Sequence, residues 1–353
     1  MNQHRHFCIS HLCLHALLYS RPRQTKRLFQ RYGDAKLIWN LPLATLAQEL
    51  RMETEKLNIL KSEIEKREMR FKADSISQDF KLISYADETY PHVLRNIFDP
   101  PAFLWMQHKL PLQAQKCVAI VGSRRASKWA LDFTYRLSVE LSERGVCVIS
   151  GLAYGIDIAA HKGALFADAS TVAVLGSGLK KMYPHSHAKL AEEIAHKGAV
   201  ISEFPLEMDA NPWQFPQRNR IVSALADGVI VIEAAQKSGS LITADFALQQ
   251  GKEMMVAPGR AGEKECAGSN ALLREGAVLI ESADDVFEAL SWQSELDVQK
   301  VEKKQKYKLE SLFTVEDFAV KEKLALHQAS LVLMEKIIAG EIEECTGGLF
   351  KCR

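Results

Sequence analysis

Short runs of apolar residues, most of them ending beside a glycine or a serine, recur through the middle of the chain. They occupy residues 118–122, 146–151, 171–176, 199–202, 228–233, 254–259 and 277–280. A short, nearly continuous apolar run is typical of a strand that is buried on both faces, as in a parallel sheet. Stretches with helical spacing, such as residues 129–144, separate the runs. This alternation predicts an α/β fold with a parallel, doubly wound sheet and helices on both faces.

The two ends of the chain have a different pattern. Apolar residues recur at helical spacing through residues 1–75, which predicts a helical domain in front of the sheet domain at residues 83–290. Pro100 and Pro101 enforce an extended chain in the lead-in to the sheet. Residues 300–308 are a lysine-rich linker. Residues 309–353 combine short helical patterns with two short strands, which is typical of a winged helix.

The C-terminal segment contains a candidate recognition helix at Leu326–Ile338. Lys336 is its one clear cation. Binding of duplex DNA needs several cations against the phosphates, so this composition favours contact with a protein over contact with duplex DNA.

Composition narrows the class of protein. The chain has 353 residues with 45 Lys+Arg against 44 Asp+Glu, a formal charge of +1, which excludes coating of nucleic acid by bulk charge. No apolar run approaches the roughly 18 residues that a membrane span needs, so we expect no membrane association. The cysteines, 7 in number, include no CxxC pair. Such cysteines suit reduced thiols, so we expect a cytoplasmic protein.

Four predicted strand-to-helix loops carry small residues, and arginine or lysine accompanies two of them. The carboxyl ends of parallel strands meet at one edge of a sheet, where small residues let backbone amides approach a phosphate. We therefore predict a phosphate site there. Its residues are Gly122, Ser123 and Arg124; Ser150 and Gly151; Lys180 and Lys181; Arg218, Asn219 and Arg220; and Ser238, Gly239, Ser240 and Thr243.

Aromatic residues near these loops suit the stacking of a base. Tyr183, just after Lys180 and Lys181, is the better candidate, whereas Phe215 suits stacking and buried packing equally well. The dinucleotide fingerprint GxGxxG and the P-loop motif are both missing, which disfavours nicotinamide and ATP sites. We expect no cofactor.

Catalytic and metal-binding constellations are weak. Asp157 and His161, four residues apart, suit an acid/base pair, but a helix N-terminal carboxylate and a hydrogen-bonded histidine explain them better. Glu203 and Glu233 follow strands, and we expect them to cap helices or tie loops. We therefore predict no catalytic residue.

A cluster near the N-terminus invites a zinc site. Cys8, His11, Cys13 and His15 crowd into one or two helical turns, a spacing that suits no common structural zinc site. We predict no metal site.

Many separate segments together resemble the DNA-processing protein family DprA, also called Smf. The matching segments are residues 83–101, 121–124, 150–161, 183–184, 201–203, 215–222, 238–244, 258–259 and 268–277. These segments occur in the same order as in the family and span residues 83–290. Residues 1–75 are similar to the family's SAM or helix-hairpin-helix-like domain, and residues 309–353 to its winged helix.

The resemblance implies a function that the residues alone do not give. Members of this family have a Rossmann-like domain that binds single-stranded DNA taken up in natural transformation. These proteins protect the DNA and load RecA onto it, and they have no established catalytic activity. By position, Arg124 and Lys180 would clamp phosphate, with Lys181 as the alternative, and Tyr183 would stack on a base. The family forms dimers, and we place the homodimer contact at Leu273 and Leu279.

Two departures and one alternative accompany the resemblance. Gln107 and His108 replace an expected glycine, which we expect only to alter a turn, and His187 replaces an asparagine, which would weaken one polar contact. The same loops also suit a nucleotide phosphate in an enzyme, as in phosphoribohydrolases that cleave an N-glycosidic bond. Residues 238–244 lack the glutamate of that family's PGGxGTxxE pattern, which counts against hydrolysis.

Overall fold

The computed structural model describes residues 9–70, 80–108, 110 and 116–292, and, nearer the C-terminus, residues 314–315, 318–319, 324, 326–338, 342–345 and 349–352. The predicted linker at 300–308 lies outside the described residues. Chain contacts divide the protein into a large unit, Met1–Ser291, and a small one, Trp292–Arg353.

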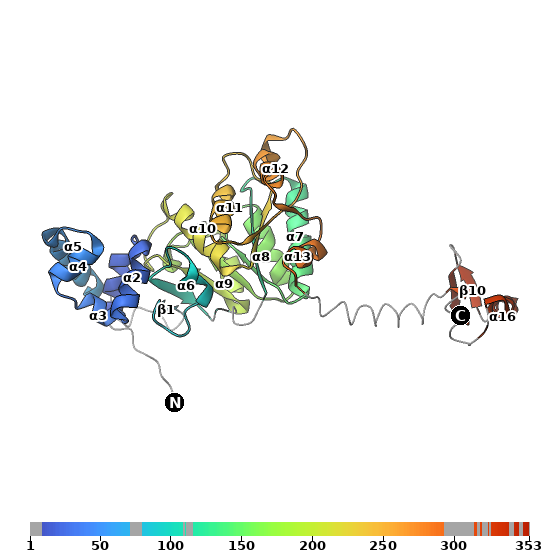
Figure 1. Cartoon of the computed structure of the whole chain (residues 1–353), viewed down its shortest axis with the longest axis horizontal. Coiled ribbons are helices and arrows are strands. Elements are labelled where there is room, and N and C mark those ends of the chain that lie inside the picture. The colour runs from blue at the N-terminus through green and yellow to red at the C-terminus, as the bar shows by residue number, and fades with distance from the viewer. Residues whose placement is uncertain are drawn as a thin grey trace, which may run out of the picture. The chain divides into compact units, whose positions relative to one another are not determined.

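A nine-stranded sheet forms the centre of the large unit (Figure 1). Its strands are β1 (Phe80–Ser84), β2 (Phe103–Gln107), β3 (Cys117–Gly122), β4 (Cys147–Ser150), β5 (Thr171–Val174), β6 (Ala199–Ser202), β7 (Gly228–Ile232), β8 (Glu253–Val256) and β9 (Val278–Leu279). The spatial order is β1-β2-β6-β5-β4-β3-β7-β8-β9, and β3 to β9 are parallel. The prediction of a mostly parallel α/β sheet is confirmed.

The lead-in to the sheet differs from the prediction of a purely parallel sheet. Strands β1 and β2 pair antiparallel with each other, and β2 pairs antiparallel with β6. The connection between β1 and β2 contains only α6 (His92–Asn96) and no crossover to the far end of the sheet, and such a return connection gives antiparallel strands. Pro100 and Pro101 lie in this connection, just before β2.

Helices cover both faces of the sheet. In the large unit they are α1 (Ile9–Leu18), α2 (Pro22–Tyr32), α3 (Ala35–Trp39), α4 (Leu43–Leu50), α5 (Thr54–Arg70), α6, α7 (Lys128–Glu143), α8 (Ile156–Phe166), α9 (Ala188–Lys197), α10 (Gln214–Leu225), α11 (Gly239–Gln249), α12 (Ala267–Arg274) and α13 (Ala283–Ala289), with short 3-10 turns η2 (Leu179–Lys181), η3 (His185–His187) and η4 (Lys264–Cys266). On β5, Val172 and Val174 share a buried cluster with α10, whereas Ala173 shares one with α9. Because side chains alternate along a strand, α9 and α10 lie on opposite faces.

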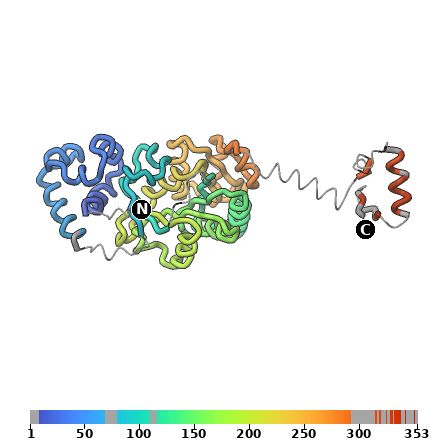
Figure 2. Tube along the Cα trace, turned by 90° about the horizontal axis from the view of Figure 1, so that it is seen from below, coloured from blue at the N-terminus to red at the C-terminus, as the bar shows by residue number. Residues whose placement is uncertain are grey.

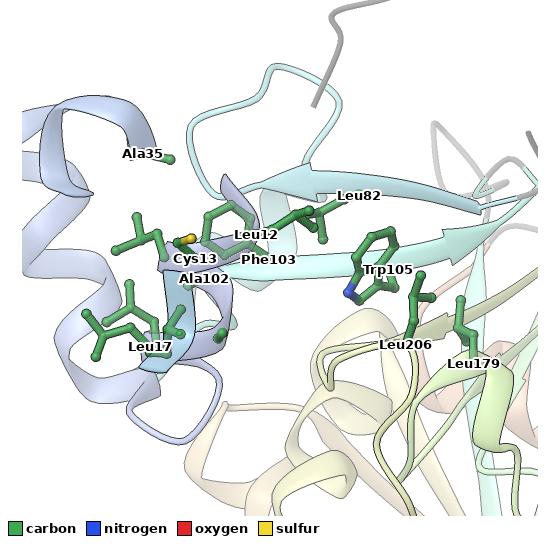
Figure 3. Close-up of a cluster of buried hydrophobic side chains, with 14 of the residues drawn as sticks. Leu12, Cys13, Leu17, Ala35, Leu82, Ala102, Phe103, Trp105, Leu179 and Leu206 are labelled. Carbon is green, nitrogen blue, oxygen red and sulfur yellow. The ribbon is translucent and has the colours of Figure 1, made fainter. Parts of the chain in front are cut away.

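The N-terminal helices share a core with the sheet. Leu12, Leu17 and Ala35 lie in the same buried cluster as Phe103 and Trp105 of β2 (Figure 3). Figure 2 shows these helices, in blue, beside the cyan segment that contains β1 and β2. The helical pattern over residues 1–75 thus corresponds to α1–α5, which pack onto the β1–β2 end of the sheet within the large unit.

The small unit has a core of its own. Its described elements are α16 (Leu326–Ile338) and the antiparallel pair β10 (Ile342–Cys345) and β11 (Leu349–Cys352). Ala329 and Leu333 of α16 are buried with Ile342 and Phe350 of the two strands. Across the described part of the chain, no helix is long and apolar enough to cross a membrane.

Candidate nucleic-acid interface

The four predicted loops meet at one edge of the sheet. They follow β3, β4, β5 and β7, which are neighbours in the order β5-β4-β3-β7. The strand order reverses at β3 and β7, because β4, β5 and β6 are added on one side of β3 and β7, β8 and β9 on the other. Open α/β sheets bind ligands at such a switch point. There the Ser123 amide donates to the Ile232 carbonyl at 3.4 Å, and a Cβ on Gly122 would overlap the same carbonyl oxygen. Gly122 is therefore required by the close approach of these two strands.

Phe215, near the start of α10, lies between the two exposed groups that we predict to bind DNA. The Arg124 guanidinium carbon lies 5.3 Å from the centre of the Phe215 ring, and the Tyr183 ring lies 6.0 Å from it. Arg124 is exposed and Tyr183 is 46% exposed, whereas Phe215 is half-buried. A Cβ on Gly176 would crowd the Phe215 ring. The Arg124 cation and the exposed Tyr183 ring thus both lie close to the Phe215 ring. An exposed ring of this kind can stack on a base while a nearby cation contacts the phosphate backbone.

Arg218, one turn further along α10, faces inward. Its guanidinium donates to the carbonyl oxygens of Gly151 and Val174, and only 4% of the residue is exposed. A Cβ on Gly151 would overlap this guanidinium, so Gly151 makes room for the arginine. Burial lowers the pKa of Arg218 to about 10, although the nearby Asp157 carboxylate acts in the opposite direction. We predicted Arg218 at the phosphate site, but the structure shows that it ties the β4 loop to the end of β5.

Asn219 reaches the fourth loop. Its side-chain amide donates to the Gly239 carbonyl at 3.2 Å. In that loop the Ser238 hydroxyl accepts from the Ser240 amide at 3.3 Å, which caps α11. Gly239 is exposed with open space at its Cβ position, whereas Ser240 and Thr243 are buried. Together, Phe215, Arg218 and Asn219 connect α10 to all four loops.

Arg220 points away from the loops. It is 1% exposed, it forms an ion pair with Glu203, and its Nε lies 3.6 Å from Asp99. Burial raises the pKa of Glu203 to about 7, against the effect of the Arg220 charge. The Glu203 carbonyl also shares a hydrogen bond of 2.8 Å with Nε2 of His15 on α1. We predicted Arg220 at the interface, and the structure places it in a buried ionic cluster instead.

Two lysines lie in the third loop, which follows β5. Lys180 Nζ lies 3.2 Å from a carboxylate oxygen of Glu207, and 27% of the lysine side chain is exposed. The Lys180 amide donates to the Leu206 carbonyl, which fixes the turn. Lys181 is partly exposed beside it. Both cations lie within three residues of Tyr183.

Ser150 uses its hydroxyl internally. The residue is fully buried, and its Oγ donates to the Ile120 carbonyl at 2.6 Å, which joins β4 to β3. The hydroxyl of Ser150, which we predicted at the phosphate site, is therefore directed into the sheet.

The acid/base candidates have structural partners. One Asp157 oxygen accepts from the amides of Gly151 and Ala153 at 3.1 and 3.2 Å, and burial raises the pKa of this carboxyl. His161 Nδ1 and the Thr171 hydroxyl share a hydrogen bond of 2.8 Å, and burial lowers the pKa of His161 to about 3. Glu233 accepts from the amide and hydroxyl of Ser127, the N-cap of α7. These residues support loops, as the sequence predicted.

The zinc candidates that the structure describes are built into the N-terminal core. His15 contacts the Glu203 carbonyl, and Cys13 is buried in the cluster that α1 shares with β2. Cys8 lies outside the described residues. Among the residues that the structure describes, no group of three His, Cys, Asp or Glu side chains is placed to hold a metal ion.

The two departures from the expected pattern have local roles. His108 follows β2 with φ +62°, in the left-handed region that favours glycine. His187 is buried, and its Nδ1 shares a hydrogen bond of 2.9 Å with the Leu152 carbonyl, so it supports the β4 loop.

The sequence contained a signal for the central role of α10 that residue-by-residue reading missed. Phe215, Arg218 and Asn219 have the i, i+3, i+4 spacing of one helix face, which predicts that they share neighbours. Read as separate loop residues, they gave no indication that one helix organises the site.

A family model identifies the protein's relatives. Residues 81–291 match the model for DNA recombination-mediator protein A, a span that covers more than half of the chain and includes all four loops. The chain belongs to this family. The DNA recombination-mediator protein A match begins in β1 and ends at the last residue of the large unit.

Comparison with individual relatives gives the same family. The chain is 37% identical over 214 residues to DNA processing protein DprA of Bacillus subtilis, which covers 60% of this chain and 72% of the relative. It is 42% identical over 213 residues to Protein Smf of Escherichia coli, which covers 60% of this chain and 57% of the relative. The second match thus spans little more than half of the relative's length.

Solved structures show the same fold. The X-ray structure of DprA from Streptococcus pneumoniae matches with a TM-score of 0.69 and 31% identity, over 78% of this chain and 95% of that one. The chain also matches a structure of DNA processing protein A from Helicobacter pylori, with a TM-score of 0.53 and 31% identity. The match covers 60% of this chain and 95% of that one, and that structure is described for its single-stranded DNA binding mode.

Proposed function

We propose that this protein binds single-stranded DNA at the carboxyl edge of its sheet, without catalysing a reaction on it. The observation that carries the proposal is the group formed by Arg124, Phe215 and Tyr183, in which an exposed guanidinium and an exposed ring are held by one half-buried ring. The single-stranded DNA binding mode described for the Helicobacter pylori relative supports the same ligand class.

The chemistry of the group favours binding that tolerates any base sequence. Arg124 would hold a phosphate, Lys180 or Lys181 the next one, and Tyr183 would stack on a base. Every base has a face that can stack, and phosphate contacts position a strand without reading its sequence. Gly239 would contribute a backbone amide, whereas the Ser123 amide is used within the sheet. Arg218 and Asn219 would act as positioning residues, and we leave the buried Arg220 out of the interface.

Family membership supports a wider role in DNA uptake. We propose that the bound strand is protected from degradation and that RecA is loaded onto it during natural transformation. Residues 1–75 would correspond to a SAM or helix-hairpin-helix-like domain, residues 83–290 to a Rossmann-like domain and residues 309–353 to a winged-helix-like domain.

A homodimer would place two such interfaces on one assembly. Leu279 on the edge strand β9 is 49% exposed, and Leu273 on α12 is half-buried. An exposed apolar side chain on an edge strand suits pairing with a second copy. We propose that Leu273 and Leu279 contribute to that contact.

Equilibrium binding to single- and double-stranded oligonucleotides across salt concentrations, with light scattering for mass, tests these proposals. We expect the protein to bind the single strand more tightly than the duplex. The logarithm of the association constant should fall by about 0.7 for each phosphate contact when the salt concentration rises tenfold. An affinity that does not change with salt would contradict the phosphate contacts. A mass that is monomeric and unaltered by Leu279→Arg would contradict the dimer contact.

A further inference from the structure

A groove with a cavity volume of about 770 Å³ lies between α8 and α9. Its lining includes Tyr135 of α7, Phe166 at the end of α8, and Leu190 of α9. Close approach of α7 and α8 brings these rings together, because Gly163 leaves room for the Tyr135 carbonyl. Since α9 and α10 cover opposite faces of the sheet, the groove lies on the face opposite α10.

The groove combines rings with positive charge. Phe166 is 72% exposed, and its ring centre lies 5.8 Å from that of Tyr135. Lys162 on α8 and Lys189 on α9 are both exposed and line the groove from its two sides. Of the described residues that line it, Glu193 is acidic, so lysines outnumber acids. An exposed ring in a groove that also carries cations can stack a base while the cations hold its phosphates.

The groove is continuous with the candidate DNA interface. Tyr154, in the loop after β4, is exposed and shares a hydrogen bond of 3.1 Å with the hydroxyl of Ser186, which lines the groove. The Tyr154 ring lies 4.7 Å from the ring of His187, which also lines the groove and bonds to the Leu152 carbonyl. The β4 loop therefore forms part of the interface and the rim of the groove.

We propose that the α8–α9 groove is a second subsite for the same single strand of DNA, which enters it past Tyr154. Phosphates contact Lys162 and Lys189, and bases stack on Phe166. The inference rests on the proposed function, since the strand must first occupy the carboxyl edge. Lysines would also attract an acidic helix of a partner protein, but continuity with the β4 loop favours the strand.

Oligonucleotide length separates the two subsites. We would measure the affinity for fluorescein-labelled oligothymidylates of about 6 and about 20 nucleotides, lengths that bracket ordinary single-strand site sizes. The wild type should bind the longer strand more tightly. Lys162→Glu with Lys189→Glu should weaken the long strand about tenfold and leave the short strand within about twofold, with a shallower salt dependence.

Matched variants test charge and ring separately. Lys56→Glu with Lys66→Glu, at two exposed positions of α5, makes the same charge change outside the groove and should leave both affinities unaltered. Phe166→Ala should weaken the long strand about fivefold. Phe98→Ala removes a ring of comparable exposure elsewhere and should not.

Each outcome decides the proposal. Retained short-strand affinity in the groove variants shows that they fold and that the first subsite works. Long-strand affinity that is unchanged in them, or equal affinity of the wild type for both lengths, would overturn the second subsite and leave the groove to a protein partner. A wild type that binds neither length would overturn the proposed function, and this inference with it.

Discussion

Two arginines that the sequence assigned to the same predicted site occupy opposite environments in this protein. Arg124, at the carboxyl edge of the sheet, is exposed and lies over the Phe215 ring, whereas Arg220 is buried against Glu203 and Asp99. An exposed cation is free to exchange water for a phosphate, while a buried one already compensates a carboxylate. Burial, more than residue type, therefore separates the binding region from the stabilising region.

The largest expected effect is on the buried region. Arg220→Ala leaves the Glu203 carboxylate buried without its cation, and we expect a loss of about 3–5 kcal/mol in the free energy of unfolding, measured by urea denaturation. Replacing both partners, as in Arg220→Met with Glu203→Leu, should restore much of that loss. If Arg220→Ala unfolds at the wild-type urea concentration, the ionic cluster does not stabilise the fold.

The loops themselves depend on Arg218. Gly151→Ala places a methyl group onto the Arg218 guanidinium, and we expect a loss of about 1–3 kcal/mol in unfolding free energy from this overpacking. Gly239→Ala is the matched control, because its Cβ meets open space, and it should change stability by less than about 0.5 kcal/mol. Equal effects of the two substitutions would show that the contact with Arg218 does not matter.

The exposed region should show the reverse behaviour of Arg220. Arg124→Ala should leave unfolding within about 0.5 kcal/mol of the wild type and weaken binding of a short single strand about tenfold, because one charged contact is lost. The neighbouring Arg125→Ala removes the same charge away from the ring and should weaken binding less, measured by fluorescence anisotropy. A larger loss for Arg125→Ala would contradict the role of the Phe215 contact.

Two buried groups should make the stability of the fold depend on pH in opposite directions. Burial lowers the pKa of His161 to about 3, so its stabilisation is complete above pH 6.5 and is lost as the pH falls towards 3. Burial raises the pKa of Glu203 to about 7, so its contribution is complete below pH 4.5 and is lost as the pH rises towards 7.

Substitution of each group should therefore alter the pH dependence of stability with opposite sign. Between pH 4.5 and 6.5, His161→Gln should make the slope of unfolding free energy against pH more negative by about 1 kcal/mol per unit, and Glu203→Gln more positive by a similar amount. Denaturation midpoints at several pH values measure both slopes. Changes of the same sign would contradict these pKa directions.

Much of the fold followed from the apolar pattern. Runs buried on both faces located β3 to β9, because only a parallel sheet covered by helices accommodates them. The antiparallel pairing of β1 and β2 was missed, since the strands are joined by a turn-rich connection, residues 85–102, that has no periodic pattern. The sharing of one core by α1 and β2 was missed for the same reason, because it depends on contacts between distant segments.

The candidate site was predicted in its location but not in its organisation. Glycine and serine at strand ends, together with Tyr183 and Arg124, placed a binding edge where parallel strands end. The sequence alone left the Phe215 ring equally suited to stacking and packing. Its contacts with Arg124 and Tyr183 place it close to both of these exposed groups in the candidate interface.

The sequence by itself determined the strands, the edge at which their loops meet and the residue types available there, because these depend on local pattern and chain direction. Only the tertiary structure decided which arginines reach solvent. Phe215, Arg218 and Asn219 face the loops, while Arg220 faces Glu203. That division depends on how α10 lies against the sheet, and therefore on neighbours that are far away in sequence.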